Sequence, residues 1–160
     1  MLTREQAFAL VRQNISKKSV FYHVIAVEAI MKALARDFEE NEEKWGLTGL
    51  LHDVDYEKTE AAPQLHSLLA EDILKGQVEP DMIKAIKTHN FEHTGVNPET
   101  KMEKALIAAD AVSIDYNVAG VMADGDYLVG LMHPFSLDVV NSLIDVRAAA
   151  VELSGMDVND

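Results

Sequence analysis

The sequence predicts a single compact all-α domain, a helical bundle of about seven helices. Apolar residues recur at helical spacing through nearly all of the 160 residues, and alternating β-branched runs are absent. The segments between the periodic stretches are short, and there is no repeat, low-complexity segment or linker. Because a chain of this length can bury a core in one unit, residues 1–160 are expected to form one domain.

Capping signals place the first three helices. The first is expected to begin at Thr3, which has a capping-box glutamine three residues later. The second covers about residues 19–39 and carries an apolar stripe. Asn41 is a good N-cap for the third, and the two glutamates after it favour the positive end of the helix dipole. This third helix leads into the apolar run that ends in His52-Asp53.

Prolines and glycines mark the later elements. Residues 54–62 are expected to form an irregular loop, after which Pro63 suits a first helical turn and Gly76 a helix end. Pro80 begins another helix, and Asn97-Pro98 is a cap followed by a first-turn proline. Residues 117–160 are expected to hold an irregular stretch and a last helix. The expected ranges of these helices are about 63–75, 80–90, 97–117 and 136–153.

Composition excludes several classes of function. The net charge is −13, from 14 basic and 27 acidic residues, so duplex nucleic acid is not an expected partner. A small phosphorylated molecule stays possible, because a local cation can reverse the field in one pocket. The absence of cysteine excludes disulfides, thiolate metal sites and cysteine nucleophiles. No apolar run reaches membrane-spanning length and no signal-peptide core is present, so a cytoplasmic protein is expected, of open oligomeric state.

Six ionisable residues occupy positions that should face the core. Each follows or precedes apolar residues at helical spacing, and Asp110 interrupts the most apolar helical segment of the chain. The six are His23, His52, Asp53, His66, His89 and Asp110. Taken singly, a core histidine can simply be hydrogen-bonded, a buried aspartate can cap a neighbouring helix, and His52-Asp53 can lie at an exposed helix end. Taken together, they would all be satisfied by divalent metal, since buried charges are paired or coordinate metals. Imidazole and carboxylate ligands suit Fe, Mn, Zn, Ni or Co without separating them.

This ordered set resembles the HD superfamily of metal-dependent phosphohydrolases, and most nearly its small stand-alone bacterial members. The resemblance covers residues 19–116, the motif core, whereas it is thin over residues 117–160. The segments Gln64-Leu65-His66 and Lys87-Thr88-His89 are similar to those of the dinuclear branch of the superfamily. The resemblance therefore implies one or two divalent ions. His23, His52, Asp53 and Asp110 would bind the first, and His66 and His89 the second, with Asp53 bridging the two.

Two further residues are candidates for catalysis beside Asp53. Many dinuclear relatives follow the His-Asp pair with Ile-Gly-Lys, whereas here Val54-Asp55-Tyr56 follows and the first lysine is Lys58. Lys58 could reach the substrate from its loop, or could be a solvated surface lysine. His93 could donate a proton to the leaving group or contact substrate at the pocket mouth, or could be a surface histidine.

The resemblance implies hydrolysis of a phosphate monoester, diester or anhydride by metal-activated water, in a small phosphorylated substrate such as a nucleotide. An HD-fold diiron oxygenase is one alternative, because the same ligands can hold redox-active iron. A metal-stabilised binding module without turnover is another. The run Asp124-Gly125-Asp126 superficially suggests a calcium loop, but it lacks the other oxygen ligands and the terminal glutamate.

Overall fold

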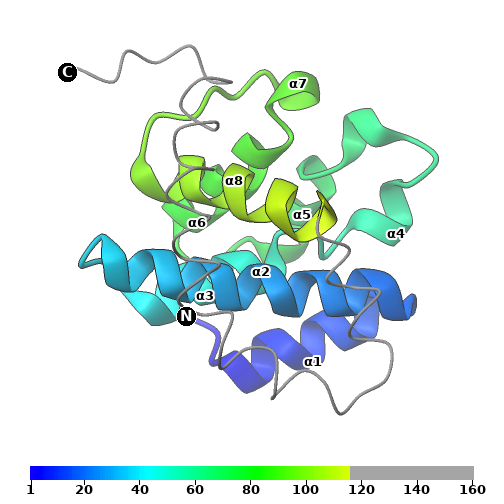
Figure 1. Cartoon of the computed structure of the whole chain (residues 1–160). Coiled ribbons are helices and arrows are strands. Elements are labelled where there is room, and N and C mark those ends of the chain that lie inside the picture. Colours follow the sequence, from blue (N-terminus) through cyan, green and yellow to red (C-terminus); the bar gives the residue numbers. More distant parts are fainter. Residues whose placement is uncertain (116–160) are drawn as a thin grey trace.

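The computed structural model describes residues 1–115, and within them every regular element is a helix (Figure 1). The all-α prediction is therefore confirmed, while the helix expected at residues 136–153 lies outside the described residues. The elements are α1 (Arg4–Asn14), α2 (Lys18–Asp37), α3 (Glu42–Leu51), α4 (Tyr56–Thr59), the 3-10 helix η1 (Pro63–Leu65), α5 (Leu68–Leu74), α6 (Pro80–His89), α7 (Phe91–Thr94) and α8 (Lys101–Asp115). None of the helices in this part of the chain is long and apolar enough to cross a bilayer.

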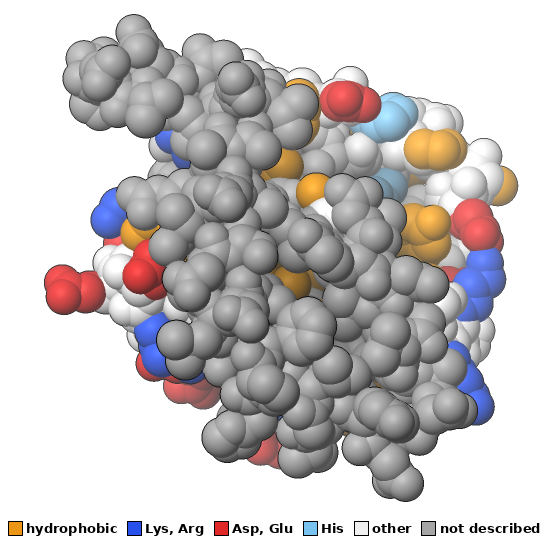
Figure 2. All heavy atoms as spheres, viewed as in Figure 1, with side chains coloured by type: hydrophobic (Ala, Val, Ile, Leu, Met, Phe, Trp, Pro, Cys, Tyr) orange, Lys and Arg blue, Asp and Glu red, His pale blue; other side chains and the backbone are white. Residues whose placement is uncertain are grey.

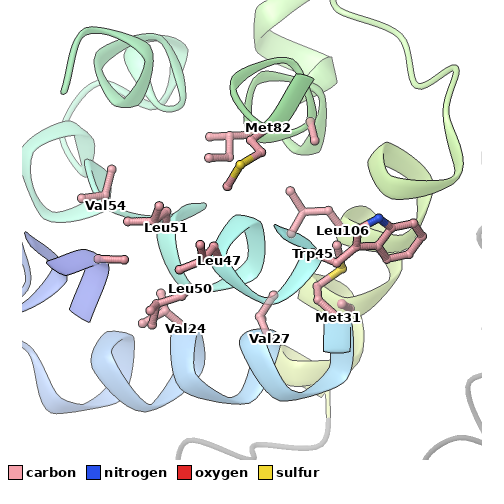
Figure 3. Close-up of a cluster of buried hydrophobic side chains, with 14 of the residues drawn as sticks. Val24, Val27, Met31, Trp45, Leu47, Leu50, Leu51, Val54, Met82 and Leu106 are labelled. Atoms are coloured by element: carbon pink, nitrogen blue, oxygen red, sulfur yellow. The ribbon is translucent and has the colours of Figure 1, made fainter. Parts of the chain in front are cut away.

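Helix α3 lies at the centre of the described fold. Every residue from Trp45 to Leu51 is buried, so this helix has no solvent-facing side beyond its first turn. It packs most extensively on α2, and it also contacts α1, α6 and α8 (Figure 1). Figure 3 shows the resulting core, in which Leu47 and Leu50 meet Val24 of α2, Met82 of α6 and other apolar side chains. Burial on all sides explains why α3 reads as continuously apolar rather than amphipathic.

The close approach of α2 and α3 depends on Gly49. A Cβ atom at this position would lie 2.8 Å from the carbonyl oxygen of Val27 and 3.0 Å from Cγ of Met31. The backbones can approach this closely only because glycine has no side chain. Since His23 lies on α2 and His52 directly follows α3, this contact also sets the separation of two candidate ligands.

Local capping signals predicted two helix starts and missed a third. Thr3 and Gln6 form the expected capping box, and the Asn41 side chain accepts from the backbone N–H of Lys44 at 2.9 Å. By contrast, α8 begins at Lys101 rather than at Asn97-Pro98. The start is fixed by a second capping box, in which the Thr100 N–H donates to Oε2 of Glu103 at 3.0 Å while the Thr100 hydroxyl accepts from the Glu103 N–H at 3.3 Å.

The segment between α3 and α6 differs from the prediction in two ways. Residues 54–62, expected as an irregular loop, contain the helical turn α4. The single helix expected over 63–75 is broken at His66 and Ser67 into η1 and α5, and Ser67 has a φ of 71°. Asp55 accounts for the break, because its carboxylate accepts from the backbone N–H groups of Ser67 at 2.8 Å and Ala70 at 3.0 Å. A side chain distant in sequence therefore caps α5.

Candidate metal centre

Two of the candidate ligands are fixed in the same way at helix ends. His52 follows the last residue of α3 and His89 is the last residue of α6. In each, Nδ1 lies against the carbonyl oxygen three residues earlier, that of Gly49 at 2.7 Å and that of Ile86 at 2.5 Å. The last carbonyls of a helix have no partner within the helix, so each imidazole satisfies one of them. Both rings consequently direct Nε2 away from their own helix.

The Nε2 atoms of four histidines converge from different elements. His23 Nε2 lies 3.1 Å from His52 Nε2, and His66 Nε2 lies 3.0 Å from His89 Nε2. The rings meet edge to face, with centroids 5.0 Å apart for the pairs His23–His52, His52–His89 and His66–His89. The structure thus brings together four histidines that lie far apart in sequence.

Two carboxylates complete the cluster. Oδ1 of Asp53 lies 3.2 Å from Nε2 of His66, 3.5 Å from that of His52 and 3.6 Å from that of His89. Oδ2 of Asp53 faces the other way, 3.5 Å from His23 Nε2. Asp110 of α8 places Oδ1 3.1 Å from His23 Nε2 and 3.7 Å from His52 Nε2. Asp53 therefore lies between the two halves of the cluster.

The ligand atoms form two overlapping groups. One contains His23, His52 and Asp110, and the other contains His52, Asp53 and His89, with the atoms of each group within 4.8 Å of one another. His66 borders the second group through its contacts with Asp53 and His89. All six residues that the sequence singled out as candidate ligands are adjacent in space, and five of them form the two overlapping groups that could hold a metal ion.

Hydrogen bonding shows that this cluster is built to hold positive charge. A carbonyl oxygen can only accept, so Nδ1 of His52 and Nδ1 of His89 both donate, which leaves a lone pair on each Nε2 in the neutral rings. His66 Nδ1 lies 2.8 Å from Oδ1 of Asp55, and His23 Nδ1 lies 2.8 Å from the Ser113 hydroxyl. In neutral rings, the inward-facing Nε2 atoms of His52, His66 and His89 are therefore acceptors that face the carboxylate oxygens of the cluster. Such an arrangement suits divalent cations, because the imidazole nitrogens and carboxylate oxygens are the kinds of ligand that bind them.

Without a metal ion, protons must supply the missing positive charge. Burial opposes the charging of His52, but Asp53 and Asp110 outweigh it and raise the pKa of this ring to about 9. Burial is likewise outweighed at His66, where Asp53 and Asp55 raise the pKa to about 9. Burial alone would raise the pKa of Asp53 and that of Asp110, yet the imidazoles beside them hold both below the usual range. Metal binding would displace these protons.

The cluster is buried at its centre and open at its edge. The His52 side chain is fully buried, whereas that of Asp110 is 23% exposed and that of His66 14%. The half-exposed ring of Tyr56 lies edge to face with His66, at a centroid distance of 5.7 Å. Solvent therefore reaches the edge of the cluster at Asp110 and His66. Histidine side chains reach the surface beside hydrophobic ones in Figure 2.

The two remaining candidates lie outside the cluster. Lys58 is exposed and its Nζ donates to Oδ1 of Asn14 at 2.6 Å, so it bonds to α1. His93 is exposed on α7, with Nδ1 2.9 Å from Oδ1 of Asn90. Asn90 in turn donates to the carbonyl oxygen of His66 at 3.0 Å. His93 is thus connected to the edge of the cluster, whereas Lys58 is held away from it.

Sequence reasoning missed two residues that orient ligands. Ser113 and Asp55 contact the outer nitrogens of His23 and His66, and both are buried. Ser113 lies three residues after Asp110 on the same helix face, a spacing that could have suggested it. Asp55 carries a weaker signal, as a third ligand-type residue that lies two positions after Asp53.

A separate surface pocket, of about 570 Å³, lies at the opposite ends of α3, α6 and α8. It contains no cluster residue, and its two lysines are already paired, Lys44 with Glu79 and Asp81 and Lys101 with Glu40. The histidine–aspartate cluster is therefore the candidate functional site.

Comparison with known families agrees with this location. A family model described as "HD domain" matches residues 20–115, more than half of the chain and a span that includes all six cluster residues. The comparisons with curated proteins and with solved structures gave no match.

Proposed function

The chain belongs to the HD domain family, whose members are generally metal-dependent hydrolases, and from this premise we propose that it is a metal-dependent phosphohydrolase. Its substrate would be a small phosphorylated molecule, such as a nucleotide, and its nucleophile would be a water molecule activated by metal. The observation that carries the proposal is the convergence of four Nε2 atoms and two carboxylates, in which the neutral rings of His52 and His89 offer lone pairs rather than donors. A purely structural polar core would pair donors with acceptors instead.

The ligand geometry suggests how the ions would be shared. His23, His52 and Asp110 would hold one ion, His66 and His89 a second, and Asp53 would contact both through its two oxygens. Bound ions of this kind supply a Lewis acid that activates water near neutral pH and neutralises phosphoryl charge. Asp53 and His52, both buried, keep this side of the site dry and rigid, which strengthens its electrostatic interactions.

The surroundings of the cluster favour a substrate whose charge is neutralised by metal. The lysines and arginines for which hydrogen bonds or ion pairs are seen in residues 1–115 bond to Asn14 or to acidic side chains outside the cluster. The phosphoryl group would then rely on metal rather than on these side chains. His93, connected through Asn90 to the open edge, is our candidate for protonating the leaving group.

Metal analysis with a phosphatase panel tests the proposal. The protein would be purified anaerobically, and assayed with Mn, Fe, Co, Ni and Mg on phosphomonoesters, phosphodiesters, nucleotides and pyrophosphate. Asp53→Ala is expected to lose both bound metal and hydrolysis, while Asp72→Ala, at an exposed aspartate of α5, should keep both. An Asp53→Ala variant with full metal content and activity would refute the assignment. Oxygen-dependent turnover with mixed-valent iron would point to an oxygenase, and metal loading with a tight ligand but no turnover to a binding module.

A further inference from the structure

Asp55 is the most completely bonded carboxylate near the cluster. It is fully buried, and its Oδ1 accepts from Nδ1 of His66 at 2.8 Å. Its Oδ2 accepts from the backbone N–H groups of Ser67 at 2.8 Å and Ala70 at 3.0 Å. Both oxygens are thus committed to the short segment that carries His66. Asp55 itself is two residues from Asp53, which contacts His66 from the opposite side.

The other three cluster histidines are oriented by different means. His52 and His89 donate to carbonyl oxygens of their own helices, so their orientation follows from helix formation alone. His23 is held by the hydroxyl of Ser113. His66 lies between η1 and α5, outside any helix, and has no local backbone carbonyl on its ring. Its orientation is therefore the one that depends on a carboxylate.

The backbone beside His66 shows that this position is held against an opposing preference. Ser67 has a left-handed conformation, with φ of 71°, which is unfavourable for a residue other than glycine. Its hydroxyl is buried and has no hydrogen-bond partner among residues 1–115. The two backbone bonds to Asp55 offset this strain and fix where His66 projects. Such strain is often kept at functional sites.

We propose that Asp55 is the positioning residue that makes His66 a metal ligand, and that it thereby controls loading of the ion held by His66 and His89. This inference rests on the proposed function in one respect, that the cluster binds two ions. Asp55 acts by keeping the His66 proton on Nδ1, so that Nε2 presents its lone pair to the ion. A carboxylate at this place also makes the imidazole a stronger ligand.

Asp55→Asn separates this role from simple capping. The amide is nearly isosteric, and its single oxygen can still accept from the two backbone N–H groups. Its NH₂ group then faces Nδ1 of His66 and must donate to it. Nδ1 becomes the acceptor, the proton moves to Nε2, and that nitrogen can no longer bind metal. The hydrogen bonds that cap α5 are therefore kept, whereas His66 is lost as a metal ligand.

Glu57→Gln is the matched control. Glu57 lies two residues from Asp55 and also accepts several hydrogen bonds, from the backbone N–H groups of Ser16 at 2.8 Å and Lys17 at 2.6 Å and from the Ser16 hydroxyl at 2.7 Å. These bonds join α4 to the connection between α1 and α2, and they do not reach the cluster. The same acid-to-amide change is therefore made in the same segment without altering a candidate ligand.

Metal stoichiometry and the His66 tautomer are the readouts. Zinc titration should give two ions per chain for the wild-type protein and for Glu57→Gln, but one for Asp55→Asn, or a second site weakened by about 10- to 100-fold. Long-range ¹⁵N–¹H NMR of the His66 ring should show the proton on Nδ1 in zinc-loaded wild-type protein and on Nε2 in Asp55→Asn. In a His66→Ala background, adding Asp55→Asn should change zinc affinity no further, because Asp55 acts through His66.

The outcomes separate the inference from the proposed function. Two equally tight ions in both the wild-type protein and Asp55→Asn would overturn the inference and leave the proposed function standing. A wild-type chain that binds no divalent ion would overturn both. If Asp55→Asn did not fold, the wild-type spectrum alone would decide, because a zinc-loaded His66 that carries its proton on Nε2 would refute the role given to Asp55.

Discussion

Replacing Gly49 by alanine places a methyl group against the backbone of α2. The new Cβ would lie 2.8 Å from the carbonyl oxygen of Val27, and 3.0 Å from the carbonyl carbon of Val27 and Cγ of Met31. Two of these three atoms belong to the backbone of a long, buried helix, so they cannot move aside singly. The helices α2 and α3 must separate by a few tenths of an ångström.

Gly46, one turn earlier on the same buried helix, provides the comparison. A Cβ there would approach Cε of Lys32 at 2.5 Å and Cγ at 2.7 Å, atoms of a flexible side chain that is one-third exposed. Both alanines gain the same helix propensity, about 0.8–1.0 kcal/mol over glycine. Gly46→Ala loses at most a few tenths of this if Lys32 leaves Glu28. Gly49→Ala bears an overpacking penalty of about 1–3 kcal/mol.

The expected difference in unfolding free energy between the two variants is therefore about 1–3 kcal/mol, with Gly49→Ala the less stable. Urea unfolding of the metal-free proteins measures it, since equal m-values license comparison of the midpoints. The separation of α2 and α3 should also widen the 3.1 Å distance between Nε2 of His23 and Nε2 of His52, and so weaken zinc binding in Gly49→Ala alone. A Gly49→Ala protein as stable as Gly46→Ala, with unchanged zinc affinity, would refute the reasoning.

Three other predictions concern the pH dependence of stability, a helix cap and catalysis. Metal-free protein should lose stability as the pH rises from about 6.5 to 9. The folded-state pKa values of His52 and His66 are about 9, above the ordinary histidine value of 6.5, so the stabilisation that is present below pH 6.5 is lost as the pH approaches 9. The zinc-induced increase in Tm should accordingly be larger at pH 8.5 than at pH 6, and an increase independent of pH would contradict this. Glu103→Ala should lower the unfolding free energy by about 1–3 kcal/mol, because two backbone N–H groups at the start of α8 lose their acceptor; an unchanged urea midpoint would count against that cap. Lys58→Met should leave turnover unchanged while His93→Gln lowers kcat, and equal losses in both would mean that Lys58 leaves its bond to α1 during catalysis.

The parts of the fold that sequence predicted are those that local interactions determine. The cap at Thr3 joins residues three apart, and the inward direction of His23 and Asp110 follows from helical spacing. The predicted start of α8 was wrong, although the signal that determines the observed start is also local. Asn97-Pro98 and the pair Thr100 and Glu103 both resemble helix starts, and the choice falls to the second because Glu103 also accepts from the Glu99 N–H at 2.6 Å.

The parts that sequence could not predict depend on contacts distant along the chain. The break at Ser67 follows from Asp55, a residue 12 positions earlier, whose carboxylate replaces intrahelical partners of α5. The hydrophobic periodicity of residues 63–75 gives no indication of such a hydrogen bond. The position of Lys58 is similar, because only the packing of α4 near α1 brings Asn14 within 2.6 Å of its Nζ.

The cluster also links metal binding to the stability of the fold. The rings of His52 and His89 each satisfy a carbonyl at the end of a buried helix and each present Nε2 to the same centre, so one side chain serves both as cap and as ligand. A cation at these two C-terminal ends interacts favourably with both helix dipoles. Because such a cation binds the folded chain and relieves the repulsion among its acceptors, its binding free energy adds to the free energy of unfolding. Asp53 contacts ligands from every part of the cluster, so without metal it is also the residue that holds the protonated histidines together.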